Sequence, residues 1–388
     1  MGNTVYTMGG NLLMNGVLQV AIYPLLNRKM GSGPLGNLLF IMGIVAILCP
    51  TVGQSLNTSR LVLRREADVS NGDYDTLLLL FGGIGSVIAL IIAWTSLENM
   101  AGGILTVVLI MTTLFRYYGD VEYRLSLYYK RYFIYYAVLT AGYLIGFGLY
   151  MLTGIWFLIF VTGEALALVY VTLTGSIFKG FLQRSPHFQL AFQRGSVLLF
   201  SYLITNLTLN IDRLVLKFII DETAVTQYYV LSLIGKTMVL LVAPVNTIII
   251  SYLTRREKNL NRREFMKFAG MGLGVAAAFF VFAELATPIF IRLLYSDLYT
   301  AVKPLITVVN ISQILGLLSA YLFIVVLTFT EAKWQLILQI IHLCVISALV
   351  IAVSGGAGLK GFSLAVLAAN IIRVVLVILL GLRKAEKV

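Results

Sequence analysis

Long apolar runs follow one another along the whole chain, and each is about as long as a helix must be to cross the hydrocarbon core of a bilayer. Short polar or charged stretches separate these runs. No predicted loop is long enough to fold as a catalytic domain, so the protein must act between its helices. The pattern predicts twelve membrane-spanning helices, at residues 4–26, 35–57, 76–95, 100–118, 132–152, 156–178, 196–219, 225–251, 269–293, 304–329, 335–353 and 361–382.

The composition agrees with this pattern. Of the 388 residues, 59% are hydrophobic and only 12% are charged, and the mean hydropathy is +0.92. We therefore predict an all-α polytopic membrane protein. Cys49 and Cys344 both lie inside apolar runs, which argues against a disulfide scaffold or a cysteine-based zinc site.

The net charge of +12 has a topological explanation. Basic residues gather in the loops on one side of the predicted spans, as in the pairs Arg64-Arg65, Lys130-Arg131 and Arg262-Arg263. By the positive-inside rule, this side is the cytoplasm and both termini are cytoplasmic. We therefore expect no nucleic-acid binding. The few basic residues on the other side are Arg28, Lys29, Lys217, Arg292, Lys303 and Lys360.

The seventh predicted span, residues 196–219, carries a polar face. An ionised side chain at membrane depth costs a few kcal/mol on insertion scales, so one that stays there usually faces a cavity or a partner. Asp212 points about a third of a turn away from the polar face. We expect this helix to present lipid with one side and a wet, charged space with the other. The residues at helical spacing on the face are Tyr202, Asn206, Asn210, Arg213 and Lys217.

A weak internal repeat links the two halves of the chain. Residues 63–66 (LRRE) close the second span and residues 254–257 (TRRE) close the eighth. The two motifs are 191 residues apart, and the same offset of 191 residues maps Asn15 onto Asn206 and Gln19 onto Asn210. We therefore predict two pseudo-symmetric six-helix bundles, residues 1–190 and 191–388, related by an axis along the membrane normal. The first span repeats the polar stripe with Asn11, Asn15, Gln19 and Tyr23.

Other spans also contain ionisable residues, and each admits two interpretations. Arg116 and Arg373 can anchor or staple helices, or they can have a functional role. Glu164 and Glu284 can each pair with a nearby arginine, or they can have a functional role. For Asp212, Arg213 and Lys236, which lie deepest in otherwise apolar helices, we favour a functional role. His342 is interpreted as a hydrogen-bonded packing residue rather than a proton relay.

Catalytic signatures are missing from the sequence. It has no P-loop, no GxSxG, no HExxH and no paired CxxC motifs. We therefore expect neither an enzyme nor a resident metal or cofactor.

Two segments carry a resemblance to a known family. Residues 206–253 contain an acidic-basic pair, Asp212-Arg213, followed by VTQYYVLSLIGK and a proline before the cytoplasmic end of the eighth span. This run and ELATPIFIRLLYSDLYTAVKPLITVVN (284–310) resemble polysaccharide flippases of the O-antigen and capsule type (Wzx-like), members of the MOP superfamily that includes the MATE transporters. The chain departs from the superfamily's lipid II flippases, which carry two further spans and basic residues in the first span.

The resemblance implies a MATE-like fold and a substrate. Such flippases move undecaprenyl-pyrophosphate-linked oligosaccharides across the bacterial cytoplasmic (inner) membrane by alternating access. It implies a monomer that works beside the polysaccharide-assembly machinery, with H+ or Na+ as coupling ion. Arg213, Lys236, Arg116 and Arg373 would neutralise the pyrophosphate. Asn11, Asn15, Gln19, Tyr202, Asn206 and Asn210 would bind sugar hydroxyls. Asp212, Glu164 and Glu284 would bind the coupling ion.

Three other functions are weighed against this one. A MATE-type multidrug or metabolite exporter would need a cavity rich in acids and aromatics, whereas the intramembrane cations here outnumber the acids. A membrane-embedded polymerase or ligase of the same pathway would need a long external loop. A structural scaffold would not need polar stripes on two equivalent helices.

Overall fold

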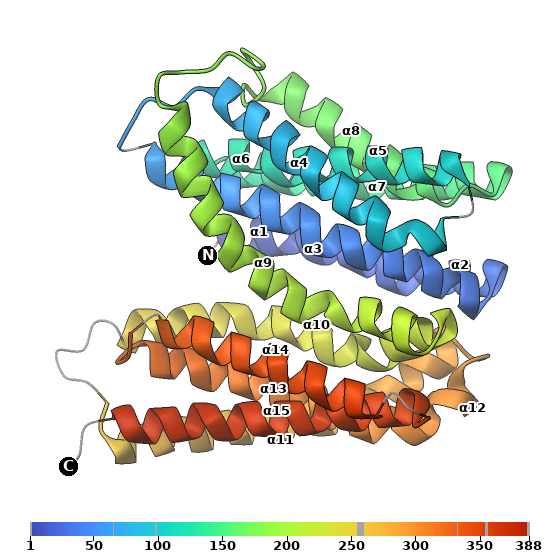
Figure 1. Cartoon of the computed structure of the whole chain (residues 1–388), viewed down its shortest axis with the longest axis vertical. Helices are drawn as coiled ribbons and strands as arrows, with labels where there is room; N and C mark the ends of the chain where they lie inside the picture. The colour runs from blue at the N-terminus through green and yellow to red at the C-terminus, as the bar shows by residue number, and fades with distance from the viewer. Residues whose placement is uncertain are drawn as a thin grey trace. The chain divides into compact units, whose positions relative to one another are not determined.

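The computed structural model describes residues 2–64, 66–97, 99–253, 260–331, 333–353 and 356–385. Within these ranges every regular element is helical, which confirms the all-α prediction (Figure 1). Residues 254–257, on which the repeat prediction partly depends, lie outside the described residues. The two pseudo-symmetric six-helix halves therefore stay a prediction.

Most predicted spans correspond to one long helix. The first span is made of three consecutive segments, α1 (Gly2–Gly16), the π-helix η1 (Val17–Ile22) and α2 (Tyr23–Met30). The later spans are α3 (Ser32–Leu63), α4 (Asn71–Ala93), α5 (Met100–Gly119), α7 (Tyr129–Thr153), α8 (Phe157–Thr174), α9 (Phe188–Ile219), α10 (Glu222–Leu253), α11 (Arg262–Leu294), α13 (Ile306–Leu327), α14 (Lys333–Val353) and α15 (Gly358–Lys384). Short connecting elements are η2 (Trp94–Ser96), α6 (Val121–Leu125), α12 (Tyr299–Val302) and η3 (Lys303–Leu305).

Length and apolar composition mark the protein as a multi-pass membrane protein. In the described part of the chain, nine helical segments are long and apolar enough to cross a membrane by these two criteria. They lie at Ser32–Leu63, Asn71–Ser96, Met100–Leu125, Tyr129–Thr153, Phe157–Thr174, Arg262–Leu294, Tyr299–Leu327, Leu336–Val353 and Gly358–Lys384.

The helices group into two compact units. Unit 1 contains Met1–Gly31 and Asn37–Leu214, and unit 2 contains Ser32–Gly36 and Val215–Val388. In unit 1, α3 is the central helix, because 78% of its most apolar stretch is buried, against 33–44% for α4, α5, α7 and α8. In unit 2, α13 has the same place, with 61% buried, against 17% for α14. The peripheral helices therefore expose the larger part of their apolar surface, as lipid contact requires.

Glycines allow a close helix contact in unit 1, between α7 and α8. A Cβ on Gly142 would lie 2.6 Å from the Cα of Gly163, and a Cβ on Gly146 would lie 2.5 Å from the carbonyl oxygen of Leu158. Gly142 and Gly146 form a small-xxx-small pair that sequence analysis did not single out, and it serves packing inside the chain.

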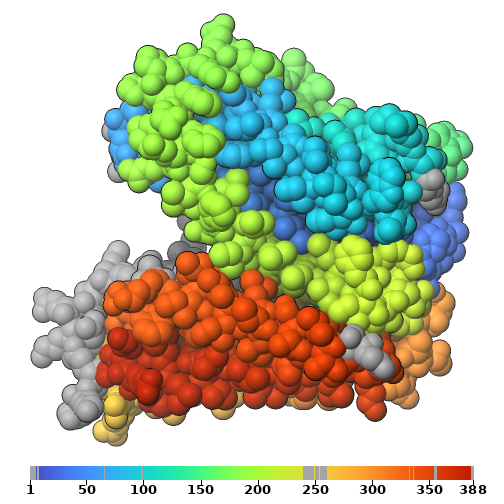
Figure 2. Space-filling view, viewed as in Figure 1, coloured from blue at the N-terminus to red at the C-terminus, as the bar shows by residue number. Residues whose placement is uncertain are grey.

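Unit 2 packs around α13, which contacts α10, α11 and α15. Phe265 of α11, Leu322 of α13 and Val377 of α15 belong to one buried cluster. In Figure 2, α14 and α15 lie side by side on the visible face of this unit, in agreement with their contacts. The core of unit 2 is thus aliphatic and aromatic, and a polar group within it needs a partner.

Local sequence signals explain where several helices begin and bend. Ser70 caps α4 by accepting from the backbone N–H of Asp73, whose carboxylate accepts in turn from the N–H of Ser70. The first span widens into a π-helix just before Pro24. Because proline has no N–H and its ring crowds the carbonyl one turn earlier, the regular ladder is interrupted there. The extra residue per turn ends the regular spacing that predicted one stripe from Asn11 to Tyr23.

Candidate functional site

The polar face predicted on α9 packs against α3 within unit 1. The hydroxyls of Tyr202 and Thr58 are 2.9 Å apart, and the Asn206 amide donates to Oγ1 of Thr51 at 3.2 Å. Asn206 is buried, with 8% of its surface exposed. Two predicted binding residues therefore contact a neighbouring helix directly in this conformation.

Arg213 lies on the same face, farther along α9. Its Cβ and Cδ both lie 3.2 Å from the point where a Cβ on Gly43 would be, so the glycine lets the arginine pass close to α3. The guanidinium is near enough to the hydroxyl of Tyr23 to interact with it electrostatically. Arg213 and its neighbour Asp212 are both half-buried. The structure thus places Arg213 close to Tyr23, at the α2 end of the first span.

Local bonds hold other predicted sugar ligands. The Asn210 amide donates to the backbone carbonyl of Asn206 at 3.1 Å, and the Asn15 amide donates to that of Asn11 at 2.9 Å. Asn11 also donates to the hydroxyl of Tyr132 on α7 at 3.4 Å. The bonds of Asn15 and Asn210 lie within one helix, so exchanging them for a ligand would break no contact between helices.

Arg116 and Glu164 form an ion pair inside unit 1. Nε of Arg116 is 2.6 Å from Oε2 of Glu164, and Nη2 of Arg116 donates to Oε1 of Glu164 at 3.3 Å. The hydroxyl of Tyr143 donates to the same Oε1 at 2.8 Å. The guanidinium also lies 3.9 Å from the ring centre of Tyr117. Only 3% of each paired side chain is exposed, so the geometry favours the structural interpretation of these two residues.

Glu284 lies in a neutral hydrogen-bond network between α11 and α13. Its Oε1 accepts from the amide of Asn310 at 2.8 Å, and its Oε2 accepts from the hydroxyl of Thr307 at 3.0 Å. The hydroxyl of Thr287 donates to Oδ1 of Asn310 at 3.2 Å. The structure therefore surrounds this carboxylate with neutral partners where sequence analysis also allowed a nearby arginine.

The remaining predicted residues are Gln19, Lys236 and Arg373. Gln19 is half-buried within the π-helix of the first span. Lys236 is half-buried on α10, in unit 2, whereas Arg213 belongs to unit 1. Arg373 is half-buried on α15 and interacts electrostatically with His342 of α14, which has 7% of its surface exposed. A joint role for Arg213, Lys236 and Arg373 stays a prediction.

An apolar groove of about 410 Å³ runs along the face of α9 next to its polar face. Its walls come from α3, α4 and α9, and nearly all its lining side chains are hydrocarbon. On α9 the lining positions extend from Ser196 to Leu214, about 27 Å at the rise of an α-helix, which approaches the thickness of the hydrocarbon core. Thr51, which accepts from Asn206, is one of the lining residues, so the groove and the polar face of α9 adjoin.

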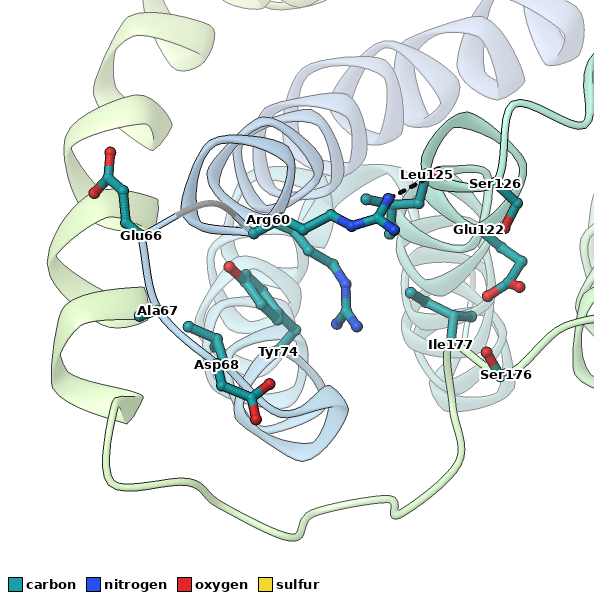
Figure 3. A pocket seen from close by; sticks show the side chains of 12 residues that line it. Arg60, Glu66, Ala67, Asp68, Tyr74, Glu122, Leu125, Ser126, Ser176 and Ile177 are labelled. Carbon is teal, nitrogen blue, oxygen red and sulfur yellow. Dashed lines mark hydrogen bonds between the residues drawn. The ribbon is translucent and has the colours of Figure 1, made fainter.

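A polar cavity of about 570 Å³ lies at the end of unit 1 that is predicted to be cytoplasmic (Figure 3). Figure 3 shows Asp68 and Tyr74 on one side of it and Glu122 and Leu125 on the other. Its two arginines, Arg60 and Arg64, lie on the side of the predicted spans where basic residues gather. Arg60 donates to the hydroxyl of Tyr118 at 2.8 Å and to the amide oxygen of Asn71, and Arg64 donates to the carbonyl of Leu125 at 2.8 Å. Acids and bonded arginines share the lining, which suits a structural junction of loops.

Several partners could be found only from the tertiary structure. Thr51, Thr58, Tyr143, Thr287, Thr307 and Asn310 are uncharged, and residues of these types are common in membrane helices as packing groups. Their role depends on which helix faces them, and spacing along one helix carries no such information.

Comparison with known proteins defines the class of fold. No family model matches the sequence, and no curated protein matches it. Solved structures of membrane transport proteins match over nearly the whole chain, and the fold is that of the MATE transporters of the MOP superfamily and of a lipid II flippase.

The structures that match include multidrug resistance MATE family transporters in inward-facing and outward-facing conformations. The inward-facing structure is 14% identical, with a TM-score of 0.61 over 98% of this chain and 93% of that one. The outward-facing structure is 14% identical, with a TM-score of 0.58 over 97% and 93%. The lipid II flippase MurJ, in an inward closed conformation, is 15% identical, with a TM-score of 0.70 over 99% of this chain and 88% of that one. These likenesses concern the fold.

Proposed function

We propose that this protein is a flippase that moves undecaprenyl-pyrophosphate-linked oligosaccharides to the outer leaflet of a bacterial inner membrane, with both termini cytoplasmic. The observation that carries the proposal is the structure of α9. On one face it presents Tyr202, Asn206, Asn210 and Arg213, and on another it lines a groove of hydrocarbon side chains. A lipid with a charged, sugar-bearing head and a long apolar tail has both of these chemistries.

The head group of such a lipid would need cations and amides. Arg213 and Lys236 would neutralise the pyrophosphate, because guanidinium and ammonium groups are the usual protein ligands of phosphates, and Arg373 would add a third cation. Asn15 and Asn210 would turn from their own helix backbone to sugar hydroxyls. We assign Arg116 to holding unit 1 together with Glu164, because its Nε and Nη2 already bond to that carboxylate and only 3% of the side chain is exposed.

The tail of the lipid would stay in an apolar environment during the whole transport step. The groove between α3, α4 and α9 would hold part of the polyprenyl chain while the head crosses, because its hydrocarbon lining is as apolar as the lipid that the chain leaves and requires no exposure of the chain to water. MATE transporters with the same fold are known in an inward-facing and in an outward-facing conformation. We propose the same alternation here, with substrate and coupling ion shifting a two-state equilibrium.

Substitution of the two predicted head-group cations tests the proposal. In a bacterial strain whose own flippase is deleted, the wild-type chain should restore surface polysaccharide, whereas Arg213→Ala and Lys236→Ala should leave the lipid-linked precursor in the inner leaflet. Arg213→Lys should retain part of the activity, since it keeps the charge. Arg194→Ala is the matched control, because it removes a surface cation from the same helix.

Two results would overturn the proposal. Full activity in both alanine variants at normal protein levels would remove these residues from the site. A wild-type chain that relieved no precursor block with any repeat unit tested, and that conferred resistance to organic cations, would establish the MATE-type exporter in its place.

A further inference from the structure

Two leucines of unit 1 have a backbone conformation that leucine rarely adopts. Among the described residues, Leu127 (φ +56°) and Leu182 (φ +63°) are the non-glycine residues with a positive φ. This left-handed conformation crowds the Cβ atom, so glycine and asparagine are its usual occupants. The two side chains are 67% and 46% exposed, so packing inside the protein does not explain their conformation. A large apolar side chain that is held outward at a local cost points to a partner outside the chain.

The surroundings of the two leucines share the same chemistry. Phe181 precedes Leu182 and is 49% exposed, and Tyr128 follows Leu127 and is 56% exposed. Exposed basic side chains accompany both apolar pairs, and neither segment contains an Asp or Glu. Both segments lie on the side of the predicted spans where basic residues gather. The segments are 127–131, with Lys130 and Arg131, and 179–184, with Lys179 and Arg184.

The start of α4 holds the tip around Leu182 in place (Figure 1). The N–H of Gln183 donates to the carbonyl of Gly180 at 3.0 Å, which closes a turn around the leucine. Beyond the turn, both carboxylate oxygens of Asp73 accept from Ser185, one from its N–H at 2.8 Å and the other from its hydroxyl at 2.6 Å. The tip is therefore preorganised, because it cannot fold inward without breaking these bonds.

The tip around Leu127 is fixed to the end of α8. The N–H of Tyr128 donates to the carbonyl of Tyr123 at 2.9 Å. Arg131 donates to the carbonyl of Thr174, the last residue of α8, at 3.3 Å, and its guanidinium lies 5.2 Å from the ring centre of Tyr128. Because the other tip follows α8 in the chain, both tips lie at the same end of unit 1.

The tip around Leu182 continues a lipid-facing surface of α5. The ring centre of Phe181 lies 6.5 Å from that of Phe115, near the end of α5. Ile104, Val108 and Phe115 follow one another at i, i+4 and i+11, so they share one face of the helix, and the first two are exposed. An exposed apolar face on a membrane-spanning helix meets lipid, so Phe181 lies where that surface ends, at the level of the head groups.

We propose that these two segments are membrane-surface anchors, a role separate from substrate transport. Their apolar pairs insert among the head groups of the leaflet on the predicted cytoplasmic side, as the apolar faces of interfacial helices do. The accompanying lysines and arginines bind lipid phosphates, which gives the anchors a preference for anionic lipids such as phosphatidylglycerol. In the described part of the chain none of these four cations forms an ion pair with a carboxylate, so their charge is available to lipid.

A spin label tests whether Phe181 lies in the membrane. The label is attached to Phe181→Cys in the full chain in lipid nanodiscs, with Cys344→Ala removing the exposed cysteine, while Cys49 is buried. Oxygen concentrates in the bilayer and a nickel chelate stays in water, so their effects on spin relaxation report the depth of the label. The label at position 181 should respond more to oxygen. The control is Glu331→Cys, an exposed position beside its ion-pair partner Lys333, where the label should respond more to the chelate.

Two further variants separate the apolar from the charged contribution. Leu182→Asn keeps the turn, because asparagine adopts the left-handed conformation readily, and it should move the label at position 181 toward water without lowering the unfolding temperature in detergent. With a fluorophore at the same position, brominated phosphatidylglycerol should quench more than brominated phosphatidylcholine, because each cation should enrich anionic lipid at the tip by about fivefold at low salt. Lys179→Gln/Arg184→Gln should abolish this preference.

Each result supports or overturns the assignment. A label at position 181 that responds to the chelate as strongly as the label at position 331 would overturn insertion and leave the apolar tip to a protein partner. Equal quenching by the two lipids would overturn the role of the cations. A label at Tyr128→Cys tests the second anchor in the same way, and a stronger response to the chelate there would overturn it. None of these measurements needs a substrate, so their outcome is independent of the proposed function.

Discussion

The guanidinium of Arg116 holds the carboxylate of Glu164 with a bond of 2.6 Å at a depth where 3% of either side chain is exposed. The pair joins α5 to α8, and Tyr143 of α7 completes it by donating to the same carboxylate. Three helices of unit 1 thus meet at one ion pair. Such pairs gain little over apolar residues of the same size, but half of a pair is costly to leave behind.

This ion pair predicts that single and double variants differ in unfolding experiments. Glu164→Leu or Arg116→Leu alone should destabilise the purified protein by about 3–5 kcal/mol, because each leaves one uncompensated buried charge. The double variant Arg116→Leu/Glu164→Leu should recover much of that loss. The free energy of unfolding of each purified variant, measured in bicelles, checks this prediction. The surface pair Arg194–Glu66, with 54% and 46% of its side chains exposed, is the control and should contribute about 1 kcal/mol or less.

Additive losses in the double variant would contradict this account, because they would mean that each residue has its own separate partner. An increase in transport on removing either charge would contradict the structural assignment as well.

A second prediction separates packing from substrate binding at Asn206. If the bond to Thr51 is its main role, Asn206→Leu and Thr51→Val should each lower stability, with a coupling of about 0.6 kcal/mol and at most about 1.7. A double-mutant cycle on the purified protein measures the coupling. Transport that is lost in Asn206→Leu but retained in Thr51→Val would instead identify Asn206 as a substrate ligand.

A third prediction concerns the glycines of α7. Leucine at Gly142 or Gly146 should separate α7 from α8 and reduce the yield of folded protein, because a Cβ at either position meets backbone at 2.5–2.6 Å. Gly148→Leu is the matched control on the same helix, since no atom lies within 4 Å of a Cβ there. Equal yields of monodisperse protein from all three variants would show that the helices do not pack this closely.

A fourth prediction addresses the groove. Ile88→Trp places a large ring in the groove and should slow flipping of a polyprenyl-linked substrate, since the tail and the ring would compete for one space. Ile91→Trp makes the same change on the same helix at a position that is 71% exposed and does not line the groove, so it should be neutral. Reconstituted vesicles with a labelled lipid-linked oligosaccharide provide the measurement. Equal rates in the two variants would place the tail elsewhere.

The sequence by itself determined the class of structure. Long apolar runs can only be helices in a bilayer, because each backbone donor and acceptor must be satisfied within its own segment, and their number predicts the many-helix fold that the structure confirms. Spacing also places Tyr202, Asn206 and Arg213 on one face of α9, and the structure brings all three to α3.

Only the tertiary structure decided which polar residues meet. Arg116 and Glu164 lie on different helices, and no periodicity within either helix could select the other as its partner. For Glu284 the sequence left open a pairing with arginine, and the fold instead supplies Thr307 and Asn310 from α13. The physical reason is that burial in lipid requires only that each polar group find a partner, whereas the choice of partner depends on how the helices pack.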